Sequence, residues 1–371
     1  MQRVDASVVI CAYNEEEFVR AALESVFAQD TRRPWEVIVV DDGSTDATEN
    51  EVNRALEECD PSLRWTYAKI EHAGLSVARN AGVELAEGRV VVFLDADAIA
   101  EPDWLTRMIN AFDDDEVVGA GGAIKILNEE DAFACMIDCF HHRRAYECAD
   151  GRVPIIGANM AFLRDVIGQV GGFRAPFVSR GDDDSVRYCV ESRGRLVFVP
   201  EASVLHTRPK SWVEWLNERR ANGRARLLVD QFMDAHPVSE ARGISRVARG
   251  RLRSSYPILF GVGVGLSLLV PLVGLSLVAS AIVAALARAA VYFTRGLDGA
   301  TKCARGHGLD PGVYHARTAM VALVSTWVND WSYAKATWLS PAVDWASASS
   351  HPNILKKRTA FDGADGACSD S

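Results

Sequence analysis

The sequence lacks several signatures that assign a function quickly, and each absence excludes a class of protein. No glycine-rich G-x-G-x-x-G pattern follows the first predicted strand, which argues against a dinucleotide-binding Rossmann domain. The eight cysteines include no C-x-x-C pair of the kind that holds zinc. No internal repeat of about 20 to 50 residues is present, which excludes solenoids and propellers. The opening residues carry no long apolar stretch after a basic region, so we expect no secretory signal peptide.

Lysine is also scarce relative to arginine, and the formal net charge is -10 at pH 7. This balance argues against a nucleic-acid partner, because neutralising phosphates requires clustered basic residues. The same bias is compatible with a high-GC genome and equally with a salt-adapted host. Cys11 and Cys189 lie in stretches that we expect in the core, which indicates free thiols and a cytosolic main domain.

What the sequence does contain, over about its first two hundred residues, is an alternation of short apolar runs and helical stretches. With 371 residues and 49% hydrophobic content, the chain is long enough for one large domain or two. The alternation predicts β-α-β units and therefore an α/β fold with a parallel sheet. We expect strands at 7–13, 35–44, 63–70 and 90–97, and helices at 15–29, 45–59 and 76–88.

Three of these strands end in polar or acidic residues: Asn14 and Glu15, Asp41 and Asp42, and Asp95 and Asp97. Ligands of open α/β sheets bind beyond the carboxyl ends of the strands. We therefore expect the acidic strand ends to converge on one site.

Asp95 and Asp97 follow an apolar strand directly, in the stretch RVVVFLDADA. Leaving such charges unpaired is costly, so a cation or a ligand must meet them. Residues i and i+2 of an extended chain point to the same side, so the two carboxylates can share a ligand. Hard oxygen donors prefer Mg²⁺ or Mn²⁺, which bind the phosphates of substrates.

The second half of the chain has a different character. Residues 211–233 predict an amphipathic helix, and an arginine-rich segment, 241–255, follows it. From Tyr256 to Ala287 there is no charged residue. One membrane span needs roughly 20 residues and two need roughly 40, so this run, extended to residue 294, predicts a hairpin of two short spans. A fully buried core helix is the alternative.

Breakers and flanking charges favour the hairpin. Pro271 and Gly274 offer a turn, and Arg295, Lys302 and Arg305 would lie on the same side as the preceding arginines, as the positive-inside rule requires. The tryptophan-rich stretch 316–342 predicts either an interfacial helix or packing on the catalytic domain. We expect a catalytic domain at 1–210, basic membrane-interface helices at 211–255, a transmembrane hairpin at 256–294, interfacial helices at 295–345 and a flexible acidic tail at 346–371.

Four motifs in order carry a family resemblance: ICAYNEEEFV, IVVDDGSTDAT, GLSVARNAGVELAEGRVVVFLDADA and GDDDSVRYCVESRG. Over about residues 5–225 the chain resembles the family 2 glycosyltransferases. The resemblance implies a GT-A fold (Rossmann-like, nucleotide-diphospho-sugar transferase), here followed by a C-terminal helical transmembrane region. It also implies that Asp95, Ala96 and Asp97 form the DxD element, which binds the nucleotide-sugar and a Mg²⁺ or Mn²⁺ ion.

The family uses the ends of the first two strands for the nucleoside. Carried over to this chain, the donor-binding residues are Ala12, Tyr13, Asn14, Glu15, Asp41 and Asp42. Tyr13 can stack on a base or ribose, and the carboxylates can accept hydrogen bonds from the imino group of the base and the hydroxyl groups of the ribose. The alternative for Asp42, Gly43 and Ser44 is an ordinary turn and helix cap. Arg79 either pairs with a donor phosphate or pairs with Asp95.

The motif GDDDSVRYC stands where the family usually shows Gly-Glu-Asp. In that register Asp182 replaces the glutamate and Asp183 is the catalytic base, whose proton affinity neighbouring Asp182 and Asp184 would raise. The aspartate at 182, and Cys189 where an arginine is common, depart from the pattern. An acidic surface turn is the alternative.

Further candidates complete the expected site. His206 is a candidate metal or diphosphate contact, with a purely structural histidine as the alternative. Gly157, Ala158 and Asn159 resemble the acceptor-side strand of the family. Arg219 and Arg220 suit a lipid phosphate, or alternatively form a solvated helix face.

Together these features predict an inverting glycosyltransferase at the cell membrane, with its catalytic domain facing the cytoplasm. It would transfer a sugar from a nucleotide-diphosphate donor to a lipid-linked phosphate or a lipid-linked glycan. Asp183 would act as the base for a hydroxyl acceptor, whereas a phosphate would need none. The QxxRW element of processive synthases is not evident. A non-catalytic nucleotide-sugar-binding subunit and a soluble nucleotidyltransferase remain as alternatives.

Overall fold

The structure is a computed structural model that describes residues 4–131, 133–135, 137–138, 153–235, 246–267, 273, 275–290, 311–339, 343 and 354–359. The chain divides into two compact units. The sheet unit comprises Met1–Leu127, Ala145–Thr207 and Ala346–Ser371, and the helical unit comprises Asn128–Arg144 and Arg208–Trp345. Each unit is described separately below.

The sheet unit is built on a nine-stranded mixed sheet in the order β5-β8-β6-β7-β4-β1-β2-β3-β9. The strands are β1 (Ala6–Ala12), β2 (Trp35–Asp41), β3 (Arg64–Ile70), β4 (Val90–Asp95), β5 (Ala98–Ala100), β6 (Val117–Ile126), β7 (Asn159–Leu163), β8 (Arg195–His206) and β9 (Ile354–Thr359). The four strands β3, β2, β1 and β4 run parallel, whereas β7 joins β4 in the antiparallel direction.

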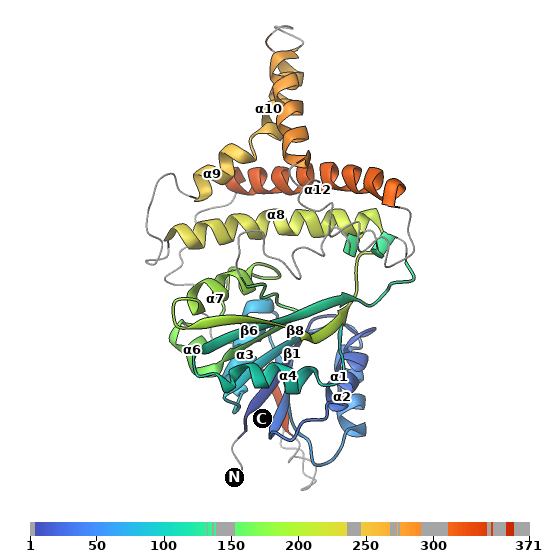
Figure 1. Ribbon diagram of the computed structural model, residues 1–371, viewed down its shortest axis with the longest axis vertical. Helices are drawn as coiled ribbons and strands as arrows, with labels where there is room; N and C mark the ends of the chain where they lie inside the picture. The colour runs from blue at the N-terminus through green and yellow to red at the C-terminus, as the bar shows by residue number, and fades with distance from the viewer. Residues whose placement is uncertain are drawn as a thin grey trace. The chain divides into compact units, whose positions relative to one another are not determined.

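Helices cover both faces of this sheet (Figure 1). Alternate residues of a strand point to opposite faces, so Val8 and Ile10 of β1 lie in one buried cluster and Val9 lies in the other. The first cluster is completed by α1 (Val19–Phe27), α2 (Thr48–Glu58) and α4 (Trp104–Asn110). The second is completed by α3 (Leu75–Leu85), α6 (Arg164–Gln169) and α7 (Asp182–Val190). Burial on both faces explains why these strands read as continuous apolar runs.

The strand order places a topological switch point at the carboxyl ends of β1 and β4, and we call this edge of the sheet the crevice. β1 pairs with β2 on one side and β4 on the other, so the connections reverse direction between β1 and β4. Such a switch point is where open α/β sheets bind their ligands. In the register of this pair, Cys11 lies opposite Asp95, at the edge of the crevice.

The first four predicted strands and the three helices between them are confirmed, with shifted ends. The expectation of a flexible tail at 346–371 is wrong for β9, which pairs antiparallel with β3. The backbone groups of β3 on that side would otherwise be unpaired, and the added strand satisfies them. The Arg358 guanidinium also donates to Asn53 Oδ1 at 2.8 Å.

The helical unit contains α8 (Trp212–Ala235), α9 (Arg246–Arg253), α10 (Tyr256–Leu266), a helical segment at 275–290 and α12 (Pro311–Leu339). α8 and α12 lie side by side (Figure 1). Trp215 is fully buried, and its indole Nε1 donates to Ser325 Oγ at 2.9 Å. Gly223 permits this close packing, because a Cβ there would lie 2.4 Å from the backbone oxygen of Asn329. The helix predicted at 211–233 is therefore confirmed, and the tryptophan-rich stretch packs on α8.

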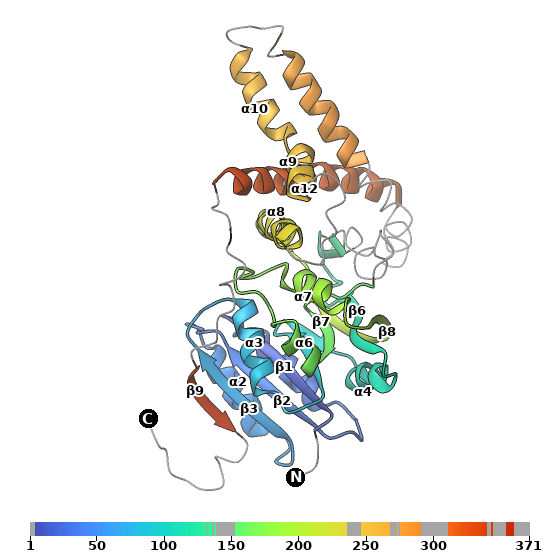
Figure 2. The same cartoon turned by 90° about the vertical axis from the view of Figure 1, so that its left-hand side faces the viewer.

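α10 and the segment 275–290 form a pair that we call the apolar hairpin (Figure 2). Tyr256, Ala281 and Ala285 form its buried contact, with Trp327 of α12 packed against them. Among the described residues, no helix combines the length and apolar character needed to cross a bilayer. The predicted turn at Pro271 and Gly274, and the basic residues Arg295, Lys302 and Arg305, lie outside the described residues.

Candidate active site

Asp95, Asp97 and His206 come together at the crevice. Asp95 ends β4, Asp97 follows two residues later, and His206 ends β8, which pairs with β5 so that Ala98 lies opposite His206. His206 Nε2 lies 3.3 Å from Asp97 Oδ1 and 3.8 Å from Asp95 Oδ2. Among the described residues, these are the one group of three potential metal-ligating side chains whose ligand atoms lie within 4.8 Å of one another.

The hydrogen bonding of His206 indicates what this cluster can hold. Its Nδ1 lies 2.8 Å from the backbone oxygen of Thr207, which only accepts, so Nδ1 must carry a proton. In the neutral ring, Nε2 then presents a lone pair toward two carboxylates. That arrangement is repulsive unless a proton or a cation lies between them. Two carboxylates and one imidazole form a donor set that fits Mg²⁺ or Mn²⁺.

Arg79 places a positive charge beside Asp95. Its guanidinium donates to Asp95 Oδ1 at 2.9 Å, to the Gly157 backbone oxygen at 3.0 Å, and to Asp182 through Nη1. Burial alone would raise the pKa of Asp95, but His206 and the charge of Arg79 outweigh burial and lower it. Of the two expectations for Arg79, the structure supports pairing with Asp95. Asp182 proves to be a buried anchor for Arg79, 2% exposed.

Asp183 lies on the other side of the same network. Its Oδ2 accepts the backbone N–H of Gly157 at 3.0 Å, and its Oδ1 accepts that of Asp184 at 2.8 Å. Burial, followed by the charges of Asp184 and Asp182, raises the pKa of Asp183 to about 7. The predicted effect of the neighbouring aspartates on Asp183 is therefore confirmed in direction. A carboxyl group with this pKa can take a proton near neutral pH.

Gly157 connects the two halves of the site through its backbone. Its oxygen accepts from Arg79 while its N–H donates to Asp183. A Cβ at this position would lie 2.7 Å from Arg79 Nη2, so only glycine fits without displacing the guanidinium. The chain of contacts thus runs from Asp95 through Arg79 and Gly157 to Asp183.

Glu15 adds a third carboxyl group near the Asp95–Asp97–His206 cluster. Its backbone N–H is held by Thr48 Oγ1 at 2.8 Å, which fixes the chain where it leaves β1. Burial and the negative charges of Asp97 and Asp95 raise the pKa of Glu15 to about 7. The carboxyl group of Glu15 therefore interacts electrostatically with Asp97 and Asp95, as expected if the ends of the strands converge.

The acidic end of β2 has a structural role in this fold. Asp41 is fully buried, and its carboxylate accepts from Ser44 N at 2.7 Å and from Tyr67 Oη at 3.0 Å. The Asp42 carboxylate is 5% exposed and accepts from Ala73 N at 2.8 Å and Gly74 N at 2.9 Å. Both carboxylates hold neighbouring loops, and the expected contact with a nucleoside stays a prediction for both.

Tyr13 is the exposed aromatic residue on this side of the crevice. It is 42% exposed and stacks on His72, with ring centroids 4.0 Å apart. Asn14 adopts a left-handed backbone, with φ of 56°, and its Oδ1 accepts from Thr45 N. Ala12, which ends β1, is buried. His72 was not predicted as a residue of this region, although its position two residues after the end of β3 was an available signal.

Two small residues and Cys11 line the crevice without polar chemistry of their own. Ala96 is 4% exposed between the two aspartates, and Ala158 is 5% exposed beside Gly157. Burial raises the pKa of the Cys11 thiol to about 12, so this side chain is a neutral thiol. Neither Cys11 nor Cys189 forms a disulfide bond, as predicted, although Cys11 is only half-buried.

The structure places the side chain of Asn159 inside the fold, and its expected acceptor-side role stays a prediction. Asn159 is fully buried, and its Nδ2 donates to Ala123 O at 2.9 Å and to Ala202 O at 2.8 Å. Its Oδ1 accepts from Trp104 Nε1 at 2.9 Å. Every polar atom of this side chain is engaged in joining β7 to neighbouring elements.

Arg219 and Arg220 belong to α8 of the helical unit. The guanidinium of Arg219 stacks over Trp215 at 4.0 Å and pairs with Glu218 at 2.7 Å. Arg220 is exposed and donates to Asn217 Oδ1 at 3.0 Å. Contact with a lipid phosphate stays a prediction for both, and Arg219 is already engaged within its own unit.

The parallel core, its switch point and a DxD pair beside a histidine define a GT-A-type nucleotide-sugar transferase domain. The Glycosyl transferase family group 2 matches residues 90–294, more than half of the chain, and the Glycosyl transferase family 2 matches residues 7–171. The chain therefore belongs to the family 2 group of glycosyltransferases, and it is a glycosyltransferase.

Individual relatives agree with this assignment. The chain is 28% identical over 221 residues to the glucosyl-dolichyl phosphate glucuronosyltransferase of Haloferax volcanii, across 54% of this chain and 68% of the relative. It is 28% identical over 202 residues to glycosyltransferase AglE of the same organism, across 54% of this chain and 66% of AglE.

The fold is similar to that of a solved structure, the mannosyltransferase PcManGT from Pyrobaculum calidifontis in complex with GDP-Man and Mn²⁺. The TM-score is 0.55 at 22% identity, over 89% of this chain and 88% of that one. At this identity the likeness shows the fold alone.

Proposed function

We propose that this glycosyltransferase moves a sugar, with inversion at the anomeric carbon, from a nucleotide-diphosphate donor to a hydroxyl group of a lipid-linked glycan. One observation carries the proposal: the Asp95–Asp97–His206 cluster is joined through Arg79 and Gly157 to Asp183, a carboxyl group with a pKa of about 7. A leaving-group site and a base are thereby held in one rigid network.

The donor side rests on the cluster and on the exposed ring of Tyr13. Asp95, Asp97 and His206 would hold a divalent cation. A bound cation of this kind offsets the negative charge of a departing diphosphate. His206 and Arg79 together lower the pKa of Asp95 against the effect of burial, and so keep this carboxylate ionised for a cation. Tyr13 offers an aromatic face to the nucleoside.

The acceptor side rests on Asp183. Its carboxylate takes the proton of the acceptor hydroxyl while that oxygen bonds to the anomeric carbon, and the nucleoside diphosphate leaves from the opposite face. The Gly157 N–H fixes one carboxylate oxygen, which orients the group. A lipid-linked phosphate is the second acceptor, and it requires no base because it is already anionic.

The names of the relatives support a lipid-linked acceptor. One acts, by its name, on glucosyl-dolichyl phosphate, which is a sugar on a lipid phosphate. We extend this acceptor class to the present chain and propose a place in the assembly of cell-surface glycans or glycoproteins.

Exposed apolar side chains support attachment to a membrane through the apolar hairpin. Val262 and Val264 of α10 and Leu275 and Val283 of the second helix are each 49% to 65% exposed. Moving such surface out of water stabilises by roughly 1 kcal/mol or more for each side chain. Arg249 and Arg251 of α9 are exposed directly before α10 and suit anionic head groups. We propose the cell membrane as the location, with the sheet unit facing the cytoplasm.

A donor screen on membranes that contain the full chain tests the function. Each nucleoside-diphosphate sugar is supplied with radiolabel in the sugar, and the released nucleotide and the label in the lipid fraction are measured. We expect one donor to release a nucleoside diphosphate and to label a lipid-linked product. A nucleotidyltransferase would instead release pyrophosphate when it is supplied with a nucleoside triphosphate and a sugar phosphate, and would release no nucleoside diphosphate from these donors. Donor binding without turnover would identify a non-catalytic subunit.

Membrane attachment has its own test. In vesicle flotation with anionic lipids, the full chain should float, and Val283→Asp together with Leu275→Asp should reduce the floating fraction severalfold. The matched control is Asp substitution of Val213, which is 69% exposed in α8 and lies outside the hairpin. Equal flotation of the two variants would contradict the role of the hairpin.

A further inference from the structure

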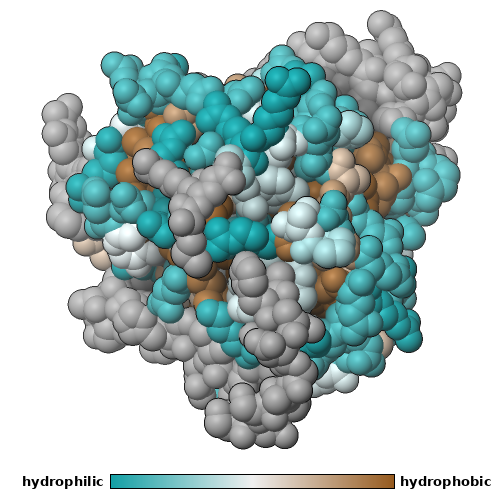
Figure 3. Space-filling view, turned by 90° about the horizontal axis from the view of Figure 1, so that it is seen from below, coloured by the Kyte–Doolittle hydropathy of each residue, from teal (hydrophilic) through white to brown (hydrophobic). Residues whose placement is uncertain are grey.

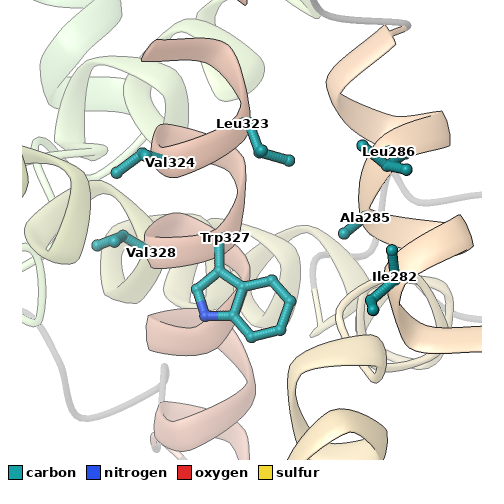
Figure 4. A pocket seen from close by; sticks show the side chains of 7 residues that line it. All are labelled: Ile282, Ala285, Leu286, Leu323, Val324, Trp327 and Val328. Atoms are coloured by element: carbon teal, nitrogen blue, oxygen red, sulfur yellow. The ribbon is translucent and has the colours of Figure 1, made fainter. Parts of the chain in front are cut away.

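A groove with wholly apolar walls and a volume of about 320 Å³ lies in the helical unit. Leu323, Val324, Trp327 and Val328 of α12 line it together with Ile282, Ala285 and Leu286 of the segment 275–290. Figure 4 shows Leu323 and Trp327 pointing from α12 toward the three residues of the facing helix. We call it the hairpin groove.

The size and lining of the hairpin groove suit a hydrocarbon chain. An apolar cavity of about 150 Å³ in a protein core holds a benzene-sized molecule, so 320 Å³ accommodates roughly twice as many carbon atoms. A polar ligand would find no hydrogen-bond partner on these walls, and burying its unpaired polar groups would cost about 1–3 kcal/mol each. The groove therefore selects for an apolar occupant.

The groove is also open to its surroundings. Ile282 and Leu286 line it, yet they are 44% and 53% exposed, and Val283 on the same helix is 65% exposed. The apolar walls thus continue onto the exposed surface of the apolar hairpin. A chain that is too long for the groove can extend along this surface without meeting a charged residue of the segment 275–287.

The groove is held in shape by a buried ionic cluster next to it. Arg288, three residues after Ala285, pairs with Asp330, which is fully buried and lies three residues after Trp327. Tyr256 also donates to Asp330, at 3.1 Å, and its ring packs edge-on against Trp327 at 5.3 Å. These contacts fix both helices that form the walls, so the groove exists before any ligand arrives.

The positive charge of α9 indicates which kind of apolar molecule occupies the groove. The exposed arginines Arg249 and Arg251 of α9 directly precede α10, at the start of the apolar hairpin. A neutral hydrocarbon would make no ionic interaction with these arginines. An amphipathic lipid with a phosphate has a chain that fits the groove and an anionic group that can pair with the arginines.

We propose that the hairpin groove binds part of the hydrocarbon chain of the lipid-linked acceptor. This inference rests on the proposed function, because it assigns the chain of that acceptor to a site. Anchoring the lipid in this way raises the residence time of the acceptor on the enzyme and makes the enzyme favour long chains over short ones.

Variants that fill the groove test the proposal directly. Ile282→Trp and Leu286→Trp place an indole into the groove and keep the surface apolar, so attachment to a membrane is preserved. Val213→Trp is the matched control, because Val213 is exposed in α8 and lies outside both the groove and the apolar hairpin. Circular dichroism and thermal unfolding verify that all three variants fold.

The probe is a polyprenyl phosphate with a diazirine at the end of its chain, bound to the full-length protein in detergent micelles. After irradiation, wild type should be labelled in peptides that contain 282–286 or 323–328. Filling the groove should reduce this labelling about tenfold, the effect of losing about 1.4 kcal/mol of binding free energy, and Val213→Trp should leave it unchanged. Labelling elsewhere in the wild type, or equal labelling of the filled and control variants, would overturn the proposal.

Transfer assays separate failure of this inference from failure of the proposed function. Filling the groove should lower kcat/KM for a long-chain acceptor about tenfold and leave kcat/KM for a short-chain, water-soluble analogue unchanged. Wild-type transfer to lipid acceptors with no effect of Ile282→Trp or Leu286→Trp would refute the groove alone. Absence of transfer to any lipid-linked acceptor by wild type would refute the proposed function, whatever the labelling shows.

Discussion

The sheet unit and the helical unit distribute charge and apolar surface in opposite ways. In the sheet unit the apolar side chains fill two buried clusters, and the acidic residues gather at strand ends around the crevice. In the apolar hairpin Leu275 and Val283 are 59% and 65% exposed, while Asp330 at its base is fully buried. The face of the molecule in Figure 3 is mainly hydrophilic, with separate hydrophobic areas.

The two units surround their buried carboxylates in different ways. In the sheet unit, Arg79 holds Asp95, and the backbone N–H groups of Gly157 and Asp184 hold Asp183. Asp330 of the helical unit is surrounded by Arg226, Arg288, Ser254 and Tyr256. The first arrangement suits catalysis, and the second suits stability in apolar surroundings.

Removing the DxD carboxylates should have the largest effect. Asp97→Ala, or Asp95→Ala, should lower kcat at least about 1000-fold, because the leaving diphosphate loses its charge stabilisation. Chelation of divalent cations should have the same effect and should be reversed by Mn²⁺ or Mg²⁺. Asp165→Ala is the control, since this residue is exposed in α6. Full activity of Asp97→Ala would refute the role of the cluster.

Substituting the proposed base should have the next largest effect. Asp183→Asn should reduce transfer to a hydroxyl acceptor about 100- to 10,000-fold, with folding intact. The pKa of Asp183 is higher in the folded than in the unfolded chain, so its stabilising contribution is present at low pH and is lost as the pH rises through about 7. The variant should therefore be more stable than wild type at about pH 8 and not at about pH 4. Thermal unfolding at both pH values, beside single-turnover rates, measures this contrast.

Breaking the ionic cluster of the helical unit should act on stability instead of chemistry. Asp330→Asn removes one partner of a buried ion pair, which costs roughly 3–5 kcal/mol. Hydrogen exchange should accelerate in α8 and α12 and stay unchanged in β1, β2 and β4. Equal acceleration in both units would show that they unfold together and would remove the contrast between them.

The smallest expected effect is a shift in pH dependence. Asp184→Asn removes a negative charge that raises the pKa of Asp183, so the acidic limb of kcat/KM near pH 7 should move to lower pH by less than about one unit. A pH profile of the variant beside that of Asp165→Asn measures it. A limb that moves upward would contradict the assignment of the limb to Asp183.

The sequence predicted the parallel half of the sheet well, because strands buried on both faces leave unbroken apolar runs. The ends of β1 and β4 located the crevice, and the DxD pair located the cluster, since these depend on local spacing. The burial of Asn159 was not predicted, because whether a polar side chain faces the surface or the core depends on neighbours far along the chain, here Ala123, Ala202 and Trp104.

Long-range pairing also explains the other differences. The anchoring of Arg79 by Asp182 joins residues 103 positions apart, and no local pattern indicates it. β9 pairs with β3 across most of the length of the chain, so its six residues read as part of a polar tail. The hairpin groove requires two helices whose separation in space the apolar run alone does not specify.

The most direct test of the central claim is a titration of the full chain with Mn²⁺, followed by electron paramagnetic resonance in the presence of the donor nucleotide. We predict one bound ion for each chain in wild type, and binding weakened at least about tenfold in both Asp97→Asn and His206→Ala. Unchanged Mn²⁺ affinity in both variants would contradict the claim that Asp95, Asp97 and His206 hold the cation beside Arg79 and Asp183.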